Sequence, residues 1–563
     1  MRKWFLLLLL PNLMLADEAP SSEEAKDDEV VVPAASAIVS ELVAKLPAPM
    51  MPAVPKGVTM AVTANSETAQ RSVRNGMLCL HTGWDFEAYR HFSSALAEDP
   101  DCLMAHWGVG LALLHGSEDL AEQREVALVR MLDLVDRGIG TELEKRYVFG
   151  LASLLRDGPA DAASAFSAAA EQFPNDPQMG LLKALLGRGG FDVTGDPTPD
   201  QERAEKDMRK LIERFPDLSY LRYALLAMRA EAPSLEGDLE MARELCTEAP
   251  GYAPYFHLLG HYEWRCGNHS RAGEAFGRAS DLYSEWMKAA NLTALHCAPW
   301  TKAECYRAVA LASKGEYDSA LAAAMAVASI EVPIEEVNSS GGRMLMWEGK
   351  TLPARILMRR GRKGDMKMAL DALPKLEELE GVGKKSLVLW SFQAHSSIAT
   401  SRLLLDKGDG EDAILVSQDV TRLGENFVKT RDVAVGMGER SEWLRTFKSF
   451  EVMASELRGL ITMSRPKADR GGAFNWYRSA IDRQSRMTLM MPPGVLLPME
   501  ARLGEYYLDR GEPDQAIDTL QEGLKKWPND LELLTRLKDA FQASGAEEKA
   551  KETEQAIKEL EAQ

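Results

Sequence analysis

The sequence lacks the features that mark a polytopic membrane protein or a nucleic-acid-binding protein. After the first sixteen or so residues, no segment approaches the roughly eighteen uninterrupted apolar residues of a membrane-spanning helix. Basic residues are outnumbered, with 66 Lys and Arg against 85 Asp and Glu, and the net charge of -19 disfavours binding to a phosphate backbone. Aromatic residues make up only 7% of the chain, while Ala, Leu and Glu are abundant, which favours helices over a sheet sandwich. We therefore expect a helical protein that does not bind nucleic acid and has no membrane span beyond its N-terminal region.

Cysteine is scarce, and motifs for catalysis or a cofactor are absent. No pair of cysteines has C-x-x-C spacing, and neither G-x-S-x-G nor H-E-x-x-H occurs. In an oxidising compartment the cysteines could form up to three disulfides, but a long helical array does not need them, so we favour small core residues. The six are Cys79, Cys102, Cys246, Cys266, Cys297 and Cys305. The sequence predicts a protein that is not an enzyme and holds no cofactor.

The N-terminus has the pattern of a secretory signal peptide. Arg2 and Lys3 precede an apolar run from Trp4 to Leu10, and an acidic segment begins after Ala16. A charged start followed by a short apolar run is typical of export signals, and the run is too short to span a bilayer. We predict that residues 1–16 are removed and that the protein is periplasmic or secreted.

The next segment, residues 17–64, is rich in acidic residues, proline and alanine. Such a composition leaves few apolar side chains for a packed face. We predict a disordered tether.

From residue 65 onwards, one spacing of small and large residues recurs. In its first copy, Gly76 lies in a first helix, Gly83 marks a turn, and Ala88 and Phe92 lie in a second helix. A glycine and an alanine allow two helices to approach closely, and a large residue fills the gap to the next pair. The other copies are Gly150, Gly158, Ala162 and Phe166; Gly260, Gly267, Ala272 and Phe276; and Gly504, Gly511, Ala516 and Leu520.

This pattern resembles the tetratricopeptide repeat family, whose unit of about 34 residues is an antiparallel pair of helices. The segment DPDCLMAHWGVGLALL, residues 99–114, is similar to one found in longer exported bacterial proteins of this family. The resemblance implies an all-α fold, an α-solenoid of helix hairpins wound as a right-handed superhelix. It also implies a concave groove, lined by the first helices, that binds a protein or peptide.

The repeats divide the chain into further segments. We predict an N-terminal solenoid over residues 65–330, and the irregular segment 331–341 is expected to separate two lobes. Residues 342–485 keep helical periodicity with a degenerate repeat signal. Residues 486–563 are predicted to form C-terminal repeats ending in a polar capping helix.

The stretch HLLGHYEWRCGNH, residues 257–269, poses a choice between a metal site and a groove. His257 and His261 lie one helical turn apart and could share a zinc ion, with His296 as a third ligand. However, Leu258 stands where H-E-x-x-H has its glutamate. The same histidines are also explained as packed side chains that bind no ligand.

The repeat register implies that several residues of this stretch face the groove. With two tyrosines of the preceding first helix, they would form an aromatic and cationic patch for a peptide carboxylate or acidic segment. The predicted groove residues are Tyr220, Tyr223, His257, His261, Trp264 and Arg265. We predict an exported, non-catalytic scaffold that binds a partner protein in its groove. The alternative is a metal-handling protein or enzyme that uses His257, His261 and His296.

Overall fold

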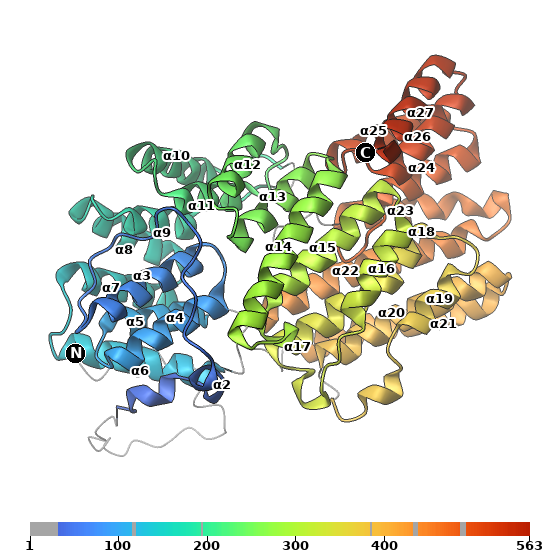
Figure 1. Cartoon of the computed structure of the whole chain (residues 1–563). Coiled ribbons are helices and arrows are strands. Elements are labelled where there is room, and N and C mark those ends of the chain that lie inside the picture. Colours follow the sequence, from blue (N-terminus) through green and yellow to red (C-terminus); the bar gives the residue numbers. More distant parts are fainter. Residues whose placement is uncertain are drawn as a thin grey trace, which may run out of the picture. The chain divides into compact units, whose positions relative to one another are not determined.

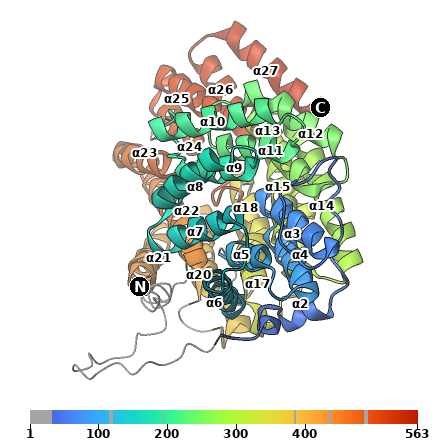
Figure 2. The same ribbon diagram turned by 90° about the vertical axis from the view of Figure 1, so that its left-hand side faces the viewer.

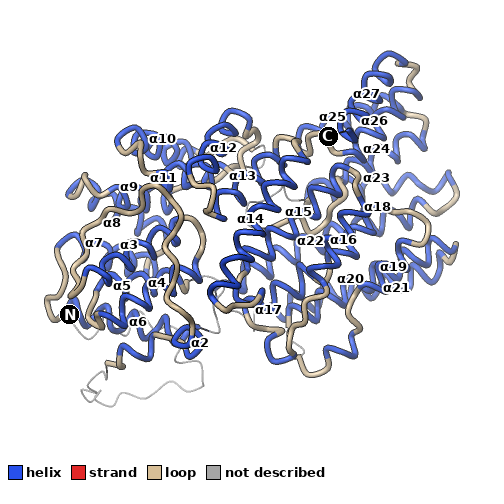
Figure 3. Tube along the Cα trace, in the orientation of Figure 1, coloured by secondary structure: helices blue, strands red, loops and turns tan. Residues whose placement is uncertain are grey.

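The computed structural model of this chain is built from α-helices joined by short loops (Figures 1 and 3). Within the described residues there is no β-strand, and the β-type pairing is one isolated bridge between Phe191 and Pro197. The all-α fold predicted from the sequence is confirmed. The structure describes residues 32–114, 120–192, 195–382, 386–431, 437–484 and 491–562.

The chain folds as two compact units. Unit 1 comprises residues 1–232 and 248–250, and unit 2 comprises residues 233–247 and 251–563. The division therefore lies near residue 240, whereas the sequence analysis placed a break at residues 331–341. That segment belongs to unit 2 because Val337 is buried in a hydrophobic cluster with Met346 and Leu357.

Unit 1 is a series of helix hairpins in which each helix packs against the next (Figure 2). Its elements are η1 (Ala35–Ile38), α2 (Glu41–Lys45), α3 (Glu67–His81), α4 (Asp85–Glu98), α5 (Leu103–Ala112), α6 (Ala121–Asp136), α7 (Glu142–Arg156), α8 (Pro159–Gln172), α9 (Pro177–Gly187), α10 (Pro199–Arg214) and α11 (Ser219–Arg229).

Unit 2 continues the same alternation of first and second helices. Its elements are η3 (Glu236–Asp238), α12 (Leu239–Glu248, of which Glu248 is assigned to unit 1), α13 (Ala253–Arg265), α14 (His269–Ala290), η4 (Ala294–His296), α15 (Ala298–Lys314), α16 (Tyr317–Ala328), η5 (Ile334–Glu336), α17 (Ser340–Met344), η6 (Leu345–Gly349), α18 (Leu352–Arg360), α19 (Asp365–Ala372), η7 (Leu376–Leu379), α20 (Leu387–Lys407), α21 (Gly410–Arg431), α22 (Met437–Met463), η8 (Lys467–Gly472), α23 (Ala473–Arg483), α24 (Met499–Arg510), α25 (Pro513–Lys526), α26 (Leu531–Ala543) and α27 (Glu547–Ala562).

The helix crossings confirm the repeat register in both units. A Cβ added to Gly76 would lie 2.8 Å from a ring carbon of Phe92, and one added to Gly260 would lie 2.7 Å from the ring of Phe276. Gly150 and Gly504 also contact a large residue that follows them at the same spacing in the sequence. These large residues are Phe166 and Leu520, respectively. Glycine is therefore required for the close approach of the two helices in each of the four predicted hairpins.

The predicted turn glycines are confirmed by their backbone conformation. Gly83, Gly158, Gly267 and Gly511 all have positive φ values, between 72° and 98°, which only glycine adopts without strain. Several helices also begin with a cap. Thr141, for example, forms a capping box with Glu144 at the start of α7.

The structure differs from the predicted tether over residues 32–64. This part of the segment contains η1, α2 and an extended stretch that packs on unit 1. Residues 1–31, including the predicted signal peptide, lie outside the described residues. The cysteines are free thiols, and all except half-buried Cys266 are buried, as predicted for small core residues.

Candidate functional site

The predicted groove residues fall into different units. Tyr220 and Tyr223 belong to α11 of unit 1, whereas the other four belong to α13 of unit 2. Tyr220 is fully buried, and its hydroxyl donates to Oε1 of Gln178 at 2.6 Å. Tyr223 is half-buried. A joint ligand patch of these tyrosines with α13 stays a prediction.

Trp264 is a core residue, and its predicted exposure in a groove is wrong. Its side chain is 1% exposed, and its indole nitrogen donates to the Ser313 hydroxyl at 3.3 Å. The ring of Tyr306 lies 5.5 Å from the Trp264 ring in an edge-on contact. The next first helix, α15, therefore covers the face of α13 on which the groove was expected. Arg265 is buried as well.

The two histidines of α13 also pack against aromatic rings. The ring of half-buried His257 makes edge-on contacts with Phe276 and Tyr306, at 5.5 and 5.7 Å. His261 is fully buried beside Tyr306. Leu258 is completely buried, whereas Leu259 is only partly buried.

Metal ligands do not gather at this place or elsewhere in the described part of the chain, where no group of three His, Cys, Asp or Glu side chains has the geometry to hold a metal ion. His296, the proposed third ligand, is half-buried, and its Nδ1 is within hydrogen-bonding distance, 3.1 Å, of the Thr293 hydroxyl. Within the same described ranges, no helix is both long enough and apolar enough to cross a membrane.

The first surface of functional interest is the one that the N-terminal segment covers. We call residues 38–65 the strap; it is the long loop-rich stretch that leads across unit 1 to α3 (Figure 3). Its first part wraps around α4. Tyr89, Arg90 and His91 are consecutive in α4 and therefore point about 100° apart around the helix axis. Their side chains bind the strap at Ile38 and Ser40, Pro47 and Met50, respectively.

The second part of the strap is extended, with alternate side chains buried. Val58, Met60 and Val62 are each 5–6% exposed, whereas Thr59 and Ala61 between them are exposed. This period of two is that of a strand-like peptide with one face on a surface. The surface of unit 1 therefore accepts an extended polypeptide through apolar side chains.

Two buried carboxylates fix the end of the strap. Glu144 accepts the backbone N–H of Thr63 at 2.7 Å and its hydroxyl at 2.8 Å. Asp99 accepts the backbone N–H and the side-chain amide of Asn65 at 2.8 and 2.9 Å. Both acids are at most 3% exposed. Hydrogen bonds to an ionised acceptor are among the stronger ones, so these contacts set the register of the strap.

The strap passes the loops between successive hairpins in reverse order of the chain. Lys56 pairs with Asp217 in the α10–α11 loop, and residues 59–61 lie against the α8–α9 loop. The contacts of Thr63 and Asn65 follow at the α6–α7 and α4–α5 junctions. Two to four extended residues cover about 7–13 Å, which matches the spacing of about 8–10 Å between packed helices. The loops thus form a regular edge along which a peptide lies antiparallel to the array.

Unit 2 contains a second extended segment, which we call the plug, residues 491–498. First helices hold its backbone carbonyls. Tyr306 donates to the carbonyl of Met491 at 2.5 Å, and Arg445 donates to that of Pro492 at 2.6 Å. Arg359 donates to the carbonyl of Leu496 at 2.5 Å. Recognition through carbonyls suits this proline-containing segment, because proline has no N–H to donate.

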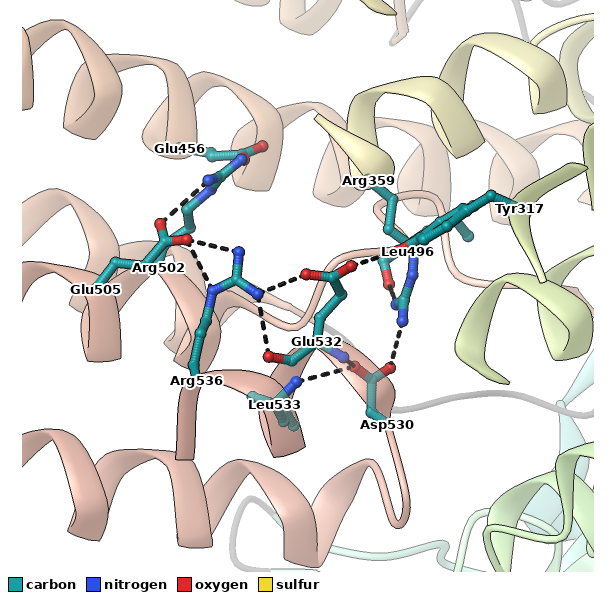
Figure 4. A network of polar contacts seen from close by, with 10 residues as sticks. All are labelled: Tyr317, Arg359, Glu456, Leu496, Arg502, Glu505, Asp530, Glu532, Leu533 and Arg536. Atoms are coloured by element: carbon teal, nitrogen blue, oxygen red, sulfur yellow. Dashed lines mark hydrogen bonds and ion pairs between the residues drawn. The ribbon is translucent and has the colours of Figure 1, made fainter. Parts of the chain in front are cut away.

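The arginines that hold the plug are themselves paired, as Figure 4 shows for Arg359. Arg359 also donates to Asp530 at 2.8 Å, and both side chains are 2% exposed. Burial is the largest single influence on Arg359 and lowers its pKa, but the neighbouring groups, first among them Asp530, together outweigh burial and raise the pKa, so the guanidinium stays charged. Arg355 and Arg445 both pair with Glu348, which is 1% exposed. The inner face of unit 2 is therefore occupied by its own chain, and each of these arginines is paired with a buried carboxylate.

Neither segment was identified from the sequence as part of a site. The alternation of Val58, Met60 and Val62 was a usable signal for the strap, but the proline-rich composition obscured it. For the plug, no local pattern shows that Arg359 and Asp530 meet, since they are 171 positions apart.

Comparison with known families identifies one segment. Residues 500–540, which span most of α24, all of α25 and most of α26, match the family Tetratricopeptide repeat. The hairpins with Gly76, Gly150 and Gly260 share the helix crossing of this segment, as predicted.

Comparison of whole chains gives only distant matches. Among solved structures, human IFIT1 dimer with m7Gppp-AAAA is 13% identical, with 82% of this chain and 90% of that chain covered and a TM-score of 0.33. The Cut9–Hcn1 hetero-tetramer of the APC/C is 14% identical, with 84% and 90% covered and a TM-score of 0.27. Yeast Tom70 is 16% identical, with 69% and 90% covered and a TM-score of 0.23. These values support no argument about function, and no curated protein matches this sequence.

Proposed function

We propose that this protein is a non-catalytic scaffold that binds an extended segment of a partner protein along the loop edge of unit 1. The strap carries this proposal, because it is an extended peptide already bound there. It uses the contacts that a partner segment would use: alternate apolar side chains and donors to Asp99 and Glu144. Stacked hairpins create long surfaces of this kind, on which binding needs no catalytic group.

The second part of the strap is proposed to be a replaceable occupant, since among the described residues only the short helices η1 and α2 precede it. Releasing residues 56–65 breaks their own contacts and leaves the helix hairpins of unit 1 in place. The plug differs because helices α23 and α24 flank it on both sides. A partner is therefore expected at the strap rather than at the plug.

A synthetic peptide of residues 54–66 tests the proposal on the full chain. Val58→Asp with Val62→Asp places two charges in the buried face of the strap and should release it. The labelled peptide should then bind this variant about ten-fold more tightly than it binds the unaltered chain, as measured by fluorescence anisotropy.

The matched control is Thr59→Asp with Ala61→Asp, which adds the same charge at exposed positions of the strap. This variant should bind the peptide no better than the unaltered chain. Circular dichroism checks that both variants are folded. If the peptide fails to bind the folded, released variant, the edge does not bind extended peptides and the proposal is wrong.

The earlier site hypotheses are weaker. The burial of Trp264 and His261 leaves little of these side chains for a partner. A metal-handling role for His257, His261 and His296 has no arrangement of ligands to favour it within the described ranges. Metal analysis of the purified protein tests that alternative directly.

We also propose that the protein is exported. The support is the sequence of residues 1–16, in which Arg2 and Lys3 precede a short apolar run. N-terminal sequencing of the mature protein should find a start near Asp17. An intact Met1 on protein recovered from the cytoplasm would rule export out.

A further inference from the structure

The loop edge of unit 1 presents one carboxylate at each of four successive junctions between hairpins. We call this row the acidic ladder. Its members are Asp99, Glu144, Asp176 and Asp217. The strap supplies a donor to three of them: Asn65 to Asp99, Thr63 to Glu144, and Lys56 to Asp217.

The strap leaves Asp176 without a donor from the segment that passes it. Asp176 is 9% exposed, and its Oδ1 accepts from the Tyr147 hydroxyl and the Gln178 backbone, both at 2.9 Å. Its other oxygen, Oδ2, is buried and has no hydrogen-bond partner among the described residues. A buried acceptor left unpaired is unfavourable, so this position is incomplete as the strap occupies it.

A cavity of about 300 Å³ lies at the same place. Its walls are residues 59–61 of the strap, Leu143, and residues 172–177 of the α8–α9 loop, which include Asp176. The strap residue whose side chain is buried here is Met60, which has no hydrogen-bond donor. The site therefore has room for a side chain beside a carboxylate residue to which the strap supplies no donor.

We propose that the partner segment is a basic extended peptide, with a lysine or arginine at the position of Met60 that fills the cavity and pairs with Asp176. This rests on the proposed function, and it specifies the chemistry of the partner. The remaining carboxylates of the acidic ladder favour a peptide that carries donors at the positions of Lys56, Thr63 and Asn65. Burial strengthens the charge-assisted bonds at Asp99, Glu144 and Asp176 relative to bonds in water, whereas Asp217 is exposed.

The strap then competes with the partner segment from within the same chain. It occupies the loop edge until a segment that also pairs with Asp176 displaces it. A second copy of this chain fits less well as the occupant, because its strap would place the same methionine beside Asp176. The net charge of -19 also opposes association of two copies and favours a basic partner.

The test uses the released chain, Val58→Asp with Val62→Asp, and three labelled peptides of residues 54–66. One has the natural sequence, one carries Met60→Lys, and one carries Ala61→Lys. The Met60→Lys peptide should bind about ten-fold more tightly than the natural peptide. The Ala61→Lys peptide has the same charge at an exposed position, so it should gain two-fold or less.

Asp176→Asn in the released chain supplies the second arm, since it keeps the shape of the side chain and removes the charge. It should abolish the preference for the Met60→Lys peptide without weakening the binding of the natural peptide. Equal affinity for the two lysine peptides, or a preference that survives Asp176→Asn, would overturn the proposal. Absence of binding by all three peptides would instead contradict the proposed function.

A measurement on the intact chain is independent of added peptide. Met60→Lys within the full chain should protect the strap, so that thermolysin cleaves before Val58 and Val62, the two sites that remain, more slowly than in the unaltered protein. Combining this change with Asp176→Asn should remove the protection. Faster cleavage of the Met60→Lys chain would show that the cavity does not accept a lysine.

Discussion

Each unit binds an extended segment of its own chain, and the end of the strap at residues 63–65 is held by chemistry opposite to that of the plug. In unit 1, carboxylates accept hydrogen bonds from the N–H groups and side chains of the strap. In unit 2, arginine and tyrosine side chains donate to the carbonyls of the plug. The acceptors of unit 1 favour a ligand with donors at particular positions, so they select a sequence. The donors of unit 2 bind backbone carbonyls, which every sequence has. Such contacts suit a fixed structural element.

The charges of the two units are balanced differently as well. Arg359 is neutralised by Asp530 from the same unit, and a continuous network links this pair to Glu532, Arg536 and Glu505 (Figure 4). In unit 1, one carboxylate oxygen of Asp176 remains unpaired among the described residues. Unit 2 also has buried atoms without a hydrogen-bond partner among the described residues, such as Nε of Arg355 and of Arg359, but these belong to cations that are already paired with a carboxylate.

The largest effect is expected from breaking the charge balance of unit 2. Arg359→Met leaves the carboxylate of Asp530 buried without its cation and should reduce the free energy of unfolding by about 3–5 kcal/mol. Denaturant titration measures the loss. Adding Asp530→Asn should recover most of it, because the amide is neutral and its oxygen still caps α26. In unit 1, Lys56→Gln breaks an exposed pair and should cost less than about 1 kcal/mol. Similar losses from the two changes would remove the contrast.

The helix crossings should respond alike in the two units. Gly150→Ala and Gly260→Ala each place a methyl group against a phenylalanine ring and should cost about 1–3 kcal/mol of unfolding free energy. Gly273, in the interior of α14, has nothing within 4 Å of an added Cβ. Gly273→Ala should therefore stabilise the protein by up to about 1 kcal/mol. Thermal melts of the three variants measure this, and equal effects of all three would mean that the repeat register is wrong.

The two bound segments should differ in their resistance to thermolysin, which cleaves before large apolar residues. The strap opens locally, so cleavage before Val58, Met60 or Val62 should proceed under native conditions. The plug leaves only when unit 2 unfolds, so cleavage before Leu496 should be at least about ten-fold slower, which corresponds to about 1.4 kcal/mol of opening free energy. Mass spectrometry of the early fragments decides the order. Plug cleavage at the same rate would show that both segments are released alike.

Acid should weaken unit 1 more than unit 2. Burial lowers the pKa of His81 and His91 to about 3 and that of His106 to about 4 in unit 1. His269 and His395 of unit 2 are lowered to about 4 for the same reason. A histidine with a lowered folded pKa contributes its stability above pH 6.5 and loses it as the pH falls from there towards the folded pKa. Each histidine should therefore lose roughly 1.4 kcal/mol per pH unit in that window.

Hydrogen exchange at pH 7 and pH 5.5, followed separately in each unit, measures this difference. His91→Gln should make the pH dependence of unit 1 shallower. An equal loss in both units would mean that other groups dominate the acid response.

The hairpins were predictable from the sequence because their determinants are local. Gly260 and Phe276 belong to neighbouring helices, and the steric demand of their crossing imposes a fixed spacing. The environment of α13 was not predictable in the same way. Trp264 is covered by Tyr306 of the next hairpin, and whether a first-helix residue is exposed depends on the size of the residue opposite.

The candidate site was less accessible to sequence reasoning than the fold. A composition rich in proline and acid predicts disorder when a segment has nothing to pack against. The strap avoids that outcome because unit 1 supplies the apolar surface and the acceptors, such as Glu144 and Asp99, from elsewhere in the chain. The sequence of a segment does not show whether residues elsewhere in the chain form a surface on which that segment packs.

The pair formed by Arg359 and Asp530 also affects how the chain is made. During synthesis α18 emerges long before α26, and the guanidinium that becomes buried has no partner until residue 530 has left the ribosome. The core of unit 2 therefore cannot form completely during synthesis, because this guanidinium stays unpaired until residue 530 is available. A chain truncated before this aspartate would keep that defect permanently, and proteases and chaperones would recognise it as unfolded. The folding of unit 2 thus depends on a contact between residues 171 positions apart.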